Sequence, residues 1–509
     1  MRKSQAFNPY LPVDTYIPDV EPHVFDGRVY AFGSHDREGG DRFCMLDYEV
    51  WSAPVDDLGA WRNEGIVYRA EQDPSYGKPD LYMYAPDVVV GNDGRYYLYY
   101  AMSGGGRFTG PIHVAVCDEP AGRYEYWGEV RNPDGTPYTR GVTFDPAVMN
   151  DDGVIRLYYG WSLAVDPKAM PGCASPEDVP REQLIGVQMM LFGKTREQIE
   201  TEPQGCMGAF TVELDDDMLT VRTEPKLLVP GQFSASGTSF EGHAFFEGSS
   251  IRRIGARYYF VYSSEHQHEL CYATSDRPDG GFGYGGVIVS NGDIGYAQRP
   301  AANRLAATGN NHGGLVCLDG QWYVFYHRQT HKTTYSRQGC AEPIEIAPDG
   351  SIAQVEMTSC GLNGGPLVAE GRYPATICCN LTNGHMPHQG TDPIDEPMPH
   401  VDDDGTDRFV AQIGDGTYAA YKYFDLTGAR RLDVTVRGQA CGTLHVLADE
   451  NAIGSIAINP TDMWRQRGAD IDVDGVHALG LRYEGEGEFE MKDIIFGVGQ
   501  APEEKEMNS

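Results

Sequence analysis

The sequence lacks any apolar run of membrane-spanning or signal-peptide length, and it is poor in basic residues. Its N-terminus, MRKSQAFNPYLPVD, is polar, and no window of about 18 consecutive apolar residues occurs anywhere. The 509 residues include 40 Lys and Arg against 74 Asp and Glu, a formal net charge of −34 that repels nucleic acid and anionic membranes. The composition therefore excludes a nucleic-acid or membrane partner and predicts a cytoplasmic protein.

Cysteine pairs at metal-binding spacing are also missing. The 11 cysteines are an odd number, scattered along the chain without a CxxC motif, and only Cys378 and Cys379 are adjacent. This pattern argues against a secreted disulfide framework and against a cysteine-rich zinc motif. Long amphipathic helical stretches are scarce, whereas Tyr (31), Gly (62) and Pro (32) are abundant. Together these features indicate an all-β chain rich in turns.

A hairpin pattern occurs five times: a polar leading residue, a short apolar strand, a turn ending in glycine and a tyrosine-rich strand. The segments are DVEPHVFDGRVYAF from Asp19, DVVVGNDGRYYLYY from Asp87, DPAVMNDDGVIRLYY from Asp145, EGSSIRRIGARYYFVY from Glu247, and HGGLVCLDGQWYVFY from His312. The leading residue lies seven positions before the turn glycine in the Asp87 segment and eight in the others. The repeat predicts a five-bladed β-propeller over residues 1–345, with an insertion around residues 162–240.

The leading residues are expected to meet, because the first strand of each propeller blade lines the central channel. Gathered carboxylates repel and desolvate one another, so this arrangement favours a functional site over a structural one. Glycosidic cleavage needs a carboxylic acid and a carboxylate, and a separation that admits a water favours inversion. Glu247, in an apolar, glycine-rich stretch, is the predicted acid, Asp19 the base, and Asp145 the group that tunes the acid's pKa.

Further residues are assigned to substrate or ion binding. Asp87 either binds substrate or is a structural residue bonded to the backbone, and His312 either holds a metal on the axis or satisfies buried polar groups. Arg337, after the fifth hairpin, is predicted to bridge sugar hydroxyls. The aromatic residues predicted to stack on sugar faces are Tyr84, Phe43 and Trp161.

The same segments resemble glycoside hydrolase family 43. The matching motifs are NPYLPVDTYIPDVEP, YAPDVVV, FDPAVMNDDG, FFEGSSIRRIG and NNHGG, which occur in the family's order over about residues 8–345. The resemblance implies a five-bladed, inverting enzyme with Asp19 as base, Asp145 as pKa modulator and Glu247 as acid. It also implies an axial ion, often Ca²⁺, beside His312. Tyr84 stands where many members carry Trp, so the resemblance does not determine which sugar the pocket binds.

The resemblance favours an exo-acting α-L-arabinofuranosidase that releases arabinose from arabinosylated plant-type glycans. A β-D-xylosidase of the same mechanism is the alternative, and an endo-arabinanase is less favoured. A non-catalytic sugar-binding propeller remains a third hypothesis, against which the full set of acid, base and modulator argues. A retaining invertase-type propeller lacks support, because neither its WMNDPNG-like motif nor its RDP and EC pairs occur.

Residues 346–500 are predicted to form bridging strands followed by a β-sandwich, and residues 501–509 a disordered tail. Short alternating strands recur from about Phe409 onward. YKYFDL, TVRGQACGTLHV and GVHALGLRYEG resemble the sandwich of carbohydrate-binding module family 6, which implies that Trp464 stacks on a sugar. The alternative is a sandwich that packs on the propeller and shapes one wall of its pocket.

Overall fold

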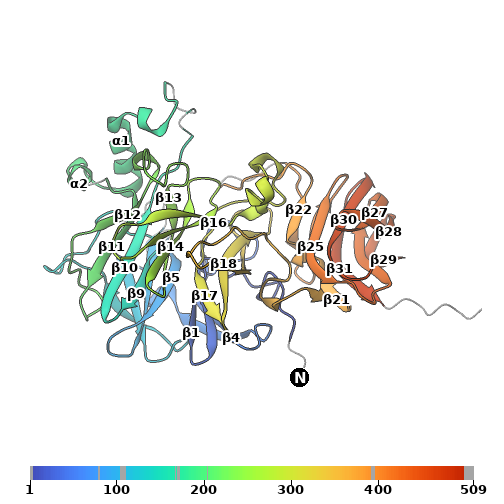
Figure 1. The fold of residues 1–509 in the computed structure, drawn as a ribbon, viewed down its shortest axis with the longest axis horizontal. Coiled ribbons are helices and arrows are strands. Elements are labelled where there is room, and N and C mark those ends of the chain that lie inside the picture. Colours follow the sequence, from blue (N-terminus) through green and yellow to red (C-terminus); the bar gives the residue numbers. More distant parts are fainter. Residues whose placement is uncertain are drawn as a thin grey trace, which may run out of the picture.

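A computed structural model describes residues 4–77, 81–103, 110–166, 168, 172–202, 205–390 and 396–497. These residues form seven β-sheets, which Figure 1 shows as two bodies, one built from β1 to β19 and a smaller one from β20 to β31. The prediction of an all-β chain is confirmed. The predicted tail, residues 501–509, lies outside the described residues.

The larger body contains five antiparallel sheets in chain order, each formed by consecutive strands. The first has β1 (Glu21–Phe25), β2 (Arg28–Phe32), β3 (Tyr48–Pro54) and β4 (Arg62–Tyr68); the second has β5 (Tyr82–Val90), β6 (Tyr96–Ser103), β7 (Ile112–Cys117) and β8 (Glu125–Glu129). The third has β9 (Ala147–Asp151), β10 (Val154–Trp161), β11 (Gly208–Leu214) and β12 (Lys226–Pro230). The fourth has β13 (Phe245–Ile254), β14 (Arg257–Ser264), β15 (Leu270–Ser275) and β16 (Gly283–Val289); the fifth has β17 (Leu315–Leu318), β18 (Gln321–Gln329) and β19 (Arg337–Ile344).

Tight turns join the first two strands of these sheets where the sequence predicted them. At Asp26-Gly27, Asp152-Gly153 and Asp319-Gly320 both turn residues have positive φ, 49° and 74°, 52° and 92°, and 49° and 86°. Two successive positive φ angles match the twist of a two-residue hairpin, and Asp and Gly tolerate them best. The repeated Asp-Gly pairs therefore fix the register of three hairpins.

Each sheet packs on its two neighbours, and the fifth packs back on the first. Five hydrophobic cores each combine side chains of two sheets: first and second, second and third, third and fourth, fourth and fifth, and fifth and first. The first strands also touch in this order, since β1 contacts β5 and β17, and β9 contacts β5 and β13. The Arg252 guanidinium on β13 donates through Nε to the Leu315 carbonyl on β17 at 2.9 Å. The residues just before and within the first strands consequently face a shared centre.

The helices belong to an insertion between β10 and β11, where the sequence predicted one. They are α1 (Arg181–Phe192) and α2 (Arg196–Thr201). The Thr195 hydroxyl accepts from the Gln198 amide, which caps α2. Phe192, at the end of α1, packs edge-on against Trp161 with ring centroids 5.8 Å apart, so the insertion reaches the end of β10.

The smaller body contains two six-stranded sheets that share one core. One sheet has β20 (Leu367–Val368), β22 (Asn380–Thr382), β25 (Tyr418–Asp425), β27 (Cys441–Ala448), β28 (Asn451–Ile458) and β30 (Val476–Glu486). The other has β21 (Gly371–Pro374), β23 (His400–Asp403), β24 (Arg408–Ile413), β26 (Arg431–Gly438), β29 (Thr461–Asp470) and β31 (Phe489–Gly497). Buried side chains of both sheets, such as Phe424 and Ile494, meet between them.

The predicted bridging strands after residue 345 are wrong. Between Ile344 and Leu367 the described chain forms one isolated bridge, Ile346 with Ile352, and the short 3-10 helix Gly361–Asn363. The connection instead follows the surface of the larger body, where the Met357 amide donates to Asp293 at 2.7 Å. Other amides of the connection donate to backbone carbonyls outside it, as Val355 does to Ile288 at 2.8 Å and Ser359 to Lys422 at 2.6 Å, so no sheet is needed.

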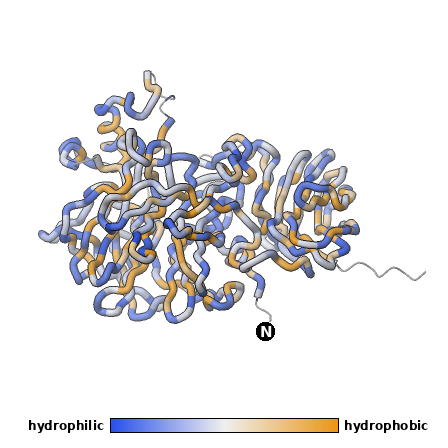
Figure 2. The backbone as a smooth tube through the Cα atoms, in the orientation of Figure 1, coloured by the Kyte–Doolittle hydropathy of each residue, from blue (hydrophilic) through white to orange (hydrophobic). Residues whose placement is uncertain are grey.

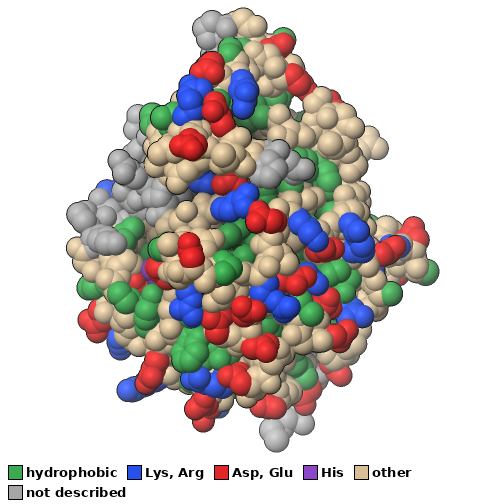
Figure 3. Space-filling view, turned by 90° about the vertical axis from the view of Figure 1, so that its left-hand side faces the viewer, with side chains coloured by type: hydrophobic (Ala, Val, Ile, Leu, Met, Phe, Trp, Pro, Cys, Tyr) green, Lys and Arg blue, Asp and Glu red, His purple; other side chains and the backbone are tan. Residues whose placement is uncertain are grey.

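Charge and hydropathy are finely mixed over the molecule. Hydrophobic and hydrophilic residues alternate along the chain in both bodies (Figure 2), and no helix among the described residues is long and apolar enough to cross a membrane. On the face seen in Figure 3, acidic and basic side chains are interspersed and no large basic patch appears.

Gly160, the residue before Trp161, has no room for a side chain. A Cβ at this position would lie 2.0 Å from the carbonyl oxygen of Gly208 on the paired strand β11. We expect Gly160→Ala to destabilise the larger body by about 1–3 kcal/mol, because backbone must shift. Gly186→Ala is the matched control: in α1 its Cβ meets nothing within 4 Å, and alanine favours helix by up to about 1 kcal/mol. Thermal unfolding of both variants checks this, and equal melting temperatures would contradict it.

Candidate active site

Asp19, Asp145 and Glu247 lie together at the centre of the larger body. Asp19 and Asp145 come just before β1 and β9, and both have positive φ, 57° and 44°. Glu247 is in β13, where the register shifts on either side of it, a bulge that re-aims its side chain. Non-glycine residues with positive φ cost roughly 1–3 kcal/mol each and concentrate at functional sites. The structure thus brings the three predicted carboxylates into electrostatic contact.

Asp19 is held as a carboxylate by a buried cation. Arg337 Nη1 donates to its Oδ1 at 2.9 Å, and its backbone N–H donates to His327 Nδ1 at 3.2 Å. Burial raises the pKa of Asp19, but Arg337, aided by His327, outweighs burial and holds the pKa well below its usual range. Oδ2 of Asp19 takes no hydrogen bond within the described residues, so it is the oxygen left for a reactant.

The surroundings of Glu247, in contrast, favour its protonated form. Burial and the charge of Asp19 raise its pKa to about 7, against smaller opposing effects of Arg337 and Trp161. The Trp161 indole N–H donates to Oε2 at 3.1 Å, which leaves Oε1 to carry a proton. Near neutral pH the site therefore pairs an ionised Asp19 with a Glu247 that can donate a proton.

Asp145 interacts electrostatically with both of these groups. Its Oδ2 accepts from the Gly248 backbone N–H at 3.0 Å and lies 3.9 Å from His312 Nδ1. Burial, then the charges of Glu247 and Asp19, raise the pKa of Asp145 well above its usual range. Asp145 and Glu247 consequently compete for protons, so a change in the charge of one changes the pKa of the other.

Arg337 lies against two carboxylates, Asp36 and Asp19. Its Nε and Nη2 donate to the two oxygens of Asp36 at 2.8 and 3.0 Å, while Nη1 donates to Asp19. The side chain is 2% exposed. These contacts with Asp36 and Asp19 fix the position of the guanidinium, and the contact with Asp19 favours the ionised form of that carboxyl. Contact of Arg337 with sugar hydroxyls stays a prediction.

Asp87 does not face the three carboxylates, and the substrate-binding prediction for it is wrong. It is fully buried inside β5, with Oδ1 2.7 Å from His23 Nε2 and Oδ2 accepting the Val148 amide at 2.7 Å. Asp87 lies three residues before Val90, the last paired residue of its strand, whereas Asp19 lies six residues before Phe25, so Asp87 is inside its strand and does not lead it. The structural alternative for Asp87 fits these contacts.

The predicted aromatic residues lie around the carboxylates in distinct roles. Trp161 orients Glu247 and is 8% exposed. Phe43 covers the Arg337 guanidinium, whose carbon lies 4.7 Å from the ring centroid. Tyr84 is half-buried against Phe144, and burial, with the charges around it, raises the pKa of its hydroxyl. Phe43 and Tyr84 keep partly exposed faces, so stacking on a sugar stays a prediction for them.

His312 lies on the other side of Asp145, above a second polar layer. Its Nε2 is 3.9 Å from Glu21 Oε1, and both atoms are buried without a hydrogen-bond partner. The other oxygen of Glu21 accepts from Arg252 Nη2 at 2.7 Å. Two unpaired buried ligand atoms facing each other fit a cation between them, so the donor set is compatible with an axial ion.

Sequence reasoning missed Asp36 and His327. Both contact residues of the site, yet neither leads a hairpin: Asp36 follows β2 and His327 lies inside β18. The Asn310 carbonyl accepts from His327 Nε2 at 2.9 Å, which leaves Nδ1 to accept the Asp19 amide. No repeat places these residues, so only the packed structure reveals them.

Comparisons with known proteins agree with this geometry. A sequence model described as "Glycosyl hydrolases family 43" matches residues 8–170 and 186–352. A "Xylosidase/arabinosidase" of Thermoclostridium stercorarium is 44% identical over 97% of this chain and 99% of its own length. A second "Xylosidase/arabinosidase", from Bacteroides ovatus, is 30% identical over 68% of this chain and 97% of its own length.

A solved structure gives the same result. A family 43 glycoside hydrolase from Xanthomonas citri, in complex with xylotriose, has a TM-score of 0.50 and 27% identity, over 69% of this chain and 93% of that one. Three clustered carboxyl groups, two of them with pKa values shifted in opposite directions, and matches that cover most of the chain lead to one assignment. The chain belongs to glycoside hydrolase family 43 and is an inverting glycoside hydrolase.

Proposed function

We propose that this enzyme is an exo-acting α-L-arabinofuranosidase that removes arabinose from arabinosylated plant glycans. The observation that carries the proposal is the opposite ionisation of two neighbouring carboxyl groups, Asp19 below and Glu247 above their usual pKa ranges. A β-D-xylosidase with the same residues is the alternative, since the relatives named "Xylosidase/arabinosidase" cover both activities.

The residue roles in the proposed mechanism follow from the contacts. Asp19 Oδ2 accepts a proton from a water as the water attacks the anomeric carbon. Glu247 Oε1 donates its proton to the departing glycosidic oxygen, while the Trp161 N–H keeps the other oxygen in place. Asp145 keeps Glu247 protonated until the bond breaks, because two adjacent carboxylates resist ionising together. Attack on the opposite face from the leaving group inverts the anomeric configuration.

We also propose the architecture that presents this site: a five-bladed β-propeller over residues 1–345 and a β-sandwich over residues 346–500. The cyclic order of the five sheet-to-sheet cores supports the propeller, and the single core between two six-stranded sheets supports the sandwich. In this architecture the site lies on the propeller axis.

The sandwich is proposed to support the pocket wall. On β24, Arg408 pairs with Glu38 at 2.7 Å, in the loop that also carries Asp36 and Phe43. Trp464, the residue expected to stack on sugar, is instead covered by Arg437 at 4.3 Å and Lys492 at 5.1 Å from its ring centroid. Cations over the indole leave less of its face for a sugar, which favours the packing alternative.

Finally, we propose that a cation, Ca²⁺ by family resemblance, is held between His312 and Glu21. Glu21 Oε1 and His312 Nε2 would be its protein ligands, with water completing a shell of mostly oxygen ligands. When bound, the ion supplies positive charge beneath the carboxylates. His312 would then be held by the ion on one side and by Asp145 on the other.

Replacing the proposed acid tests the enzyme and its substrate together. We expect Glu247→Gln to lower kcat/KM by about 10²–10⁴-fold, because the amide keeps the Trp161 contact but donates no proton. Release of nitrophenol from nitrophenyl α-L-arabinofuranoside and β-D-xyloside measures it, and the better substrate decides between the two activities. Glu241→Gln, at an exposed glutamate in the segment just before β13, is the control. Equal rates for wild type and Glu247→Gln would refute the assignment.

The pH profile tests the proton competition between Asp145 and Glu247. Because the folded pKa of Glu247 is raised to about 7, the acid is protonated below that pH, and kcat/KM should fall as the pH rises through it. Asp145→Asn removes the carboxyl that shares protons with Glu247 and should move this alkaline limb to lower pH. Asp118→Asn, at an 87% exposed side chain, should leave the limb in place. An unmoved limb in Asp145→Asn would exclude the modulating role.

Chelation tests the axial ion. Treatment with a chelator is expected to lower the melting temperature, and added Ca²⁺ to restore it, because a ligand bound only to the folded state stabilises it. Glu21→Gln keeps an oxygen for Arg252 but loses the free carboxylate charge, so this variant should no longer respond. A wild-type melting temperature that chelation leaves unchanged would contradict an exchangeable ion here.

A further inference from the structure

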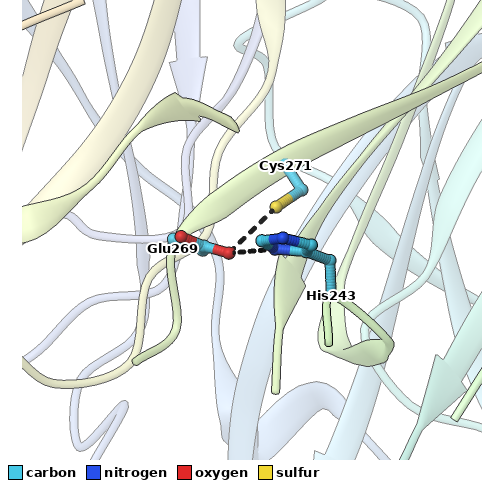
Figure 4. A group of neighbouring side chains, drawn as sticks. All are labelled: His243, Glu269 and Cys271. Atoms are coloured by element: carbon cyan, nitrogen blue, oxygen red, sulfur yellow. Dashed lines mark hydrogen bonds and ion pairs between the residues drawn. The ribbon is translucent and has the colours of Figure 1, made fainter. Parts of the chain in front are cut away.

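A second cluster of ligand-type side chains lies on the fourth sheet, away from the carboxylates of the active site. His243, Glu269 and Cys271 point toward one another (Figure 4), and one ligand atom from each lies within 4.8 Å of the others. His243 comes two residues before β13, Glu269 directly precedes β15, and Cys271 is the second residue of β15. Since residues two apart on a strand face the same side, the backbone itself aims Glu269 and Cys271 at one point.

We propose that His243 Nδ1, the Glu269 carboxylate and the Cys271 thiolate bind one Zn²⁺ ion, with water as the fourth ligand. Three protein ligands of imidazole, carboxylate and thiolate type with one open position are a known zinc arrangement. A thiolate disfavours Ca²⁺ and Mg²⁺, which prefer oxygen. The site is independent of the proposed function of Asp19 and Glu247.

The distances are close to those of a tetrahedral ion. Cys271 Sγ lies 3.7 Å from Glu269 Oε1, near the separation of about 3.5 Å that zinc–sulfur and zinc–oxygen bonds of 2.3 and 2.0 Å imply. His243 Nδ1 is 2.5 Å from the same oxygen and has to retreat by about 1 Å. The His243 side chain is 34% exposed, so it is the one with room to move.

The surroundings orient the ligands as metal sites require. The Tyr284 ring stacks on His243 with centroids 4.5 Å and planes 11° apart, and Tyr262 donates to the His243 carbonyl at 2.7 Å. The Ser264 hydroxyl donates to Glu269 Oε1 at 3.2 Å. Such supporting contacts fix the orientation of metal ligands and contribute to affinity.

Charge balance and access also favour an ion. Glu269 is 5% exposed in its side chain and Cys271 is fully buried, whereas His243 opens the cluster to solvent. One Zn²⁺ would balance the carboxylate and the thiolate together, and the displaced thiol proton would leave to the solvent. The ion and its water would enter on the His243 side. Sequence motifs gave no hint, because the ligands lie 26 and 2 residues apart.

Cobalt substitution provides the test. Apo-enzyme titrated with Co²⁺ should develop a thiolate-to-metal charge-transfer band that saturates at one equivalent, and Zn²⁺ should displace it. Cys271→Ser should abolish the band and weaken Zn²⁺ binding by at least about 100-fold, more than loss of a supporting contact costs. Cys317→Ser, at an exposed cysteine, is the matched control and should keep both. The axial donors His312 and Glu21 include no thiol, so an ion there gives no such band.

A second variant tests the zinc site even if Cys271→Ser does not fold. His243→Ala changes a partly exposed side chain and should weaken Zn²⁺ binding while glycosidase activity reports an intact fold. His445→Ala on β27 is its control, expected to bind as wild type. Wild-type enzyme without a saturable charge-transfer band, a band that survives Cys271→Ser, or unchanged affinity in His243→Ala would each overturn the zinc site.

Discussion

The buried guanidinium of Arg337 determines how the carboxylates of the active site share charge. Two of its nitrogens, Nε and Nη2, donate to Asp36, and Nη1 donates to Asp19. One cation therefore lies against two anions in a space almost closed to water. Removing one partner from such a group strands a buried charge and costs several kcal/mol. With Asp19 ionised by this contact, its negative charge raises the pKa of Glu247 and of Asp145. The contact between Arg337 and Asp19 is thus the origin of the opposite pKa shifts of Asp19 and Glu247.

Local backbone geometry turns this electrostatic arrangement into a site. Asp19 and Asp145 adopt positive φ just before their strands, and Glu247 occupies a bulge. Each of these backbone conformations raises the free energy of the folded state, and contacts within the local segment do not compensate for this cost. The sheets that pack on both sides of each first strand supply it, since the cores between neighbouring sheets are continuous around the larger body. The contacts that stabilise the fold are therefore the same contacts that hold the site's carboxylates in place.

The repeat predicted the all-β chain, its hairpin turns and the convergence of Asp19, Asp145 and Glu247, because strand period and turn residues are local properties of sequence. It misplaced Asp87, which lies inside β5 because the turn of that hairpin is longer, and it could not find Asp36 or His327, which contact the site from outside the leading positions. In the smaller body, β29 was missed because its residues are largely exposed and lack the apolar alternation of a buried strand. A role that depends on contacts between residues distant in sequence can be assigned only from the structure.

The smaller body reaches the chemistry through the same arginine. Arg408 on β24 fixes Glu38, whose Oε1 also accepts the Tyr16 hydroxyl at 2.9 Å. Glu38 lies two residues after Asp36, the partner that holds Arg337 in place. An interface contact that anchors this loop limits how far Asp36 can move, and so limits how far the guanidinium can leave Asp19. The sheets of the smaller body are thereby connected, through Glu38 and the loop that carries Asp36, to the guanidinium that lowers the pKa of Asp19.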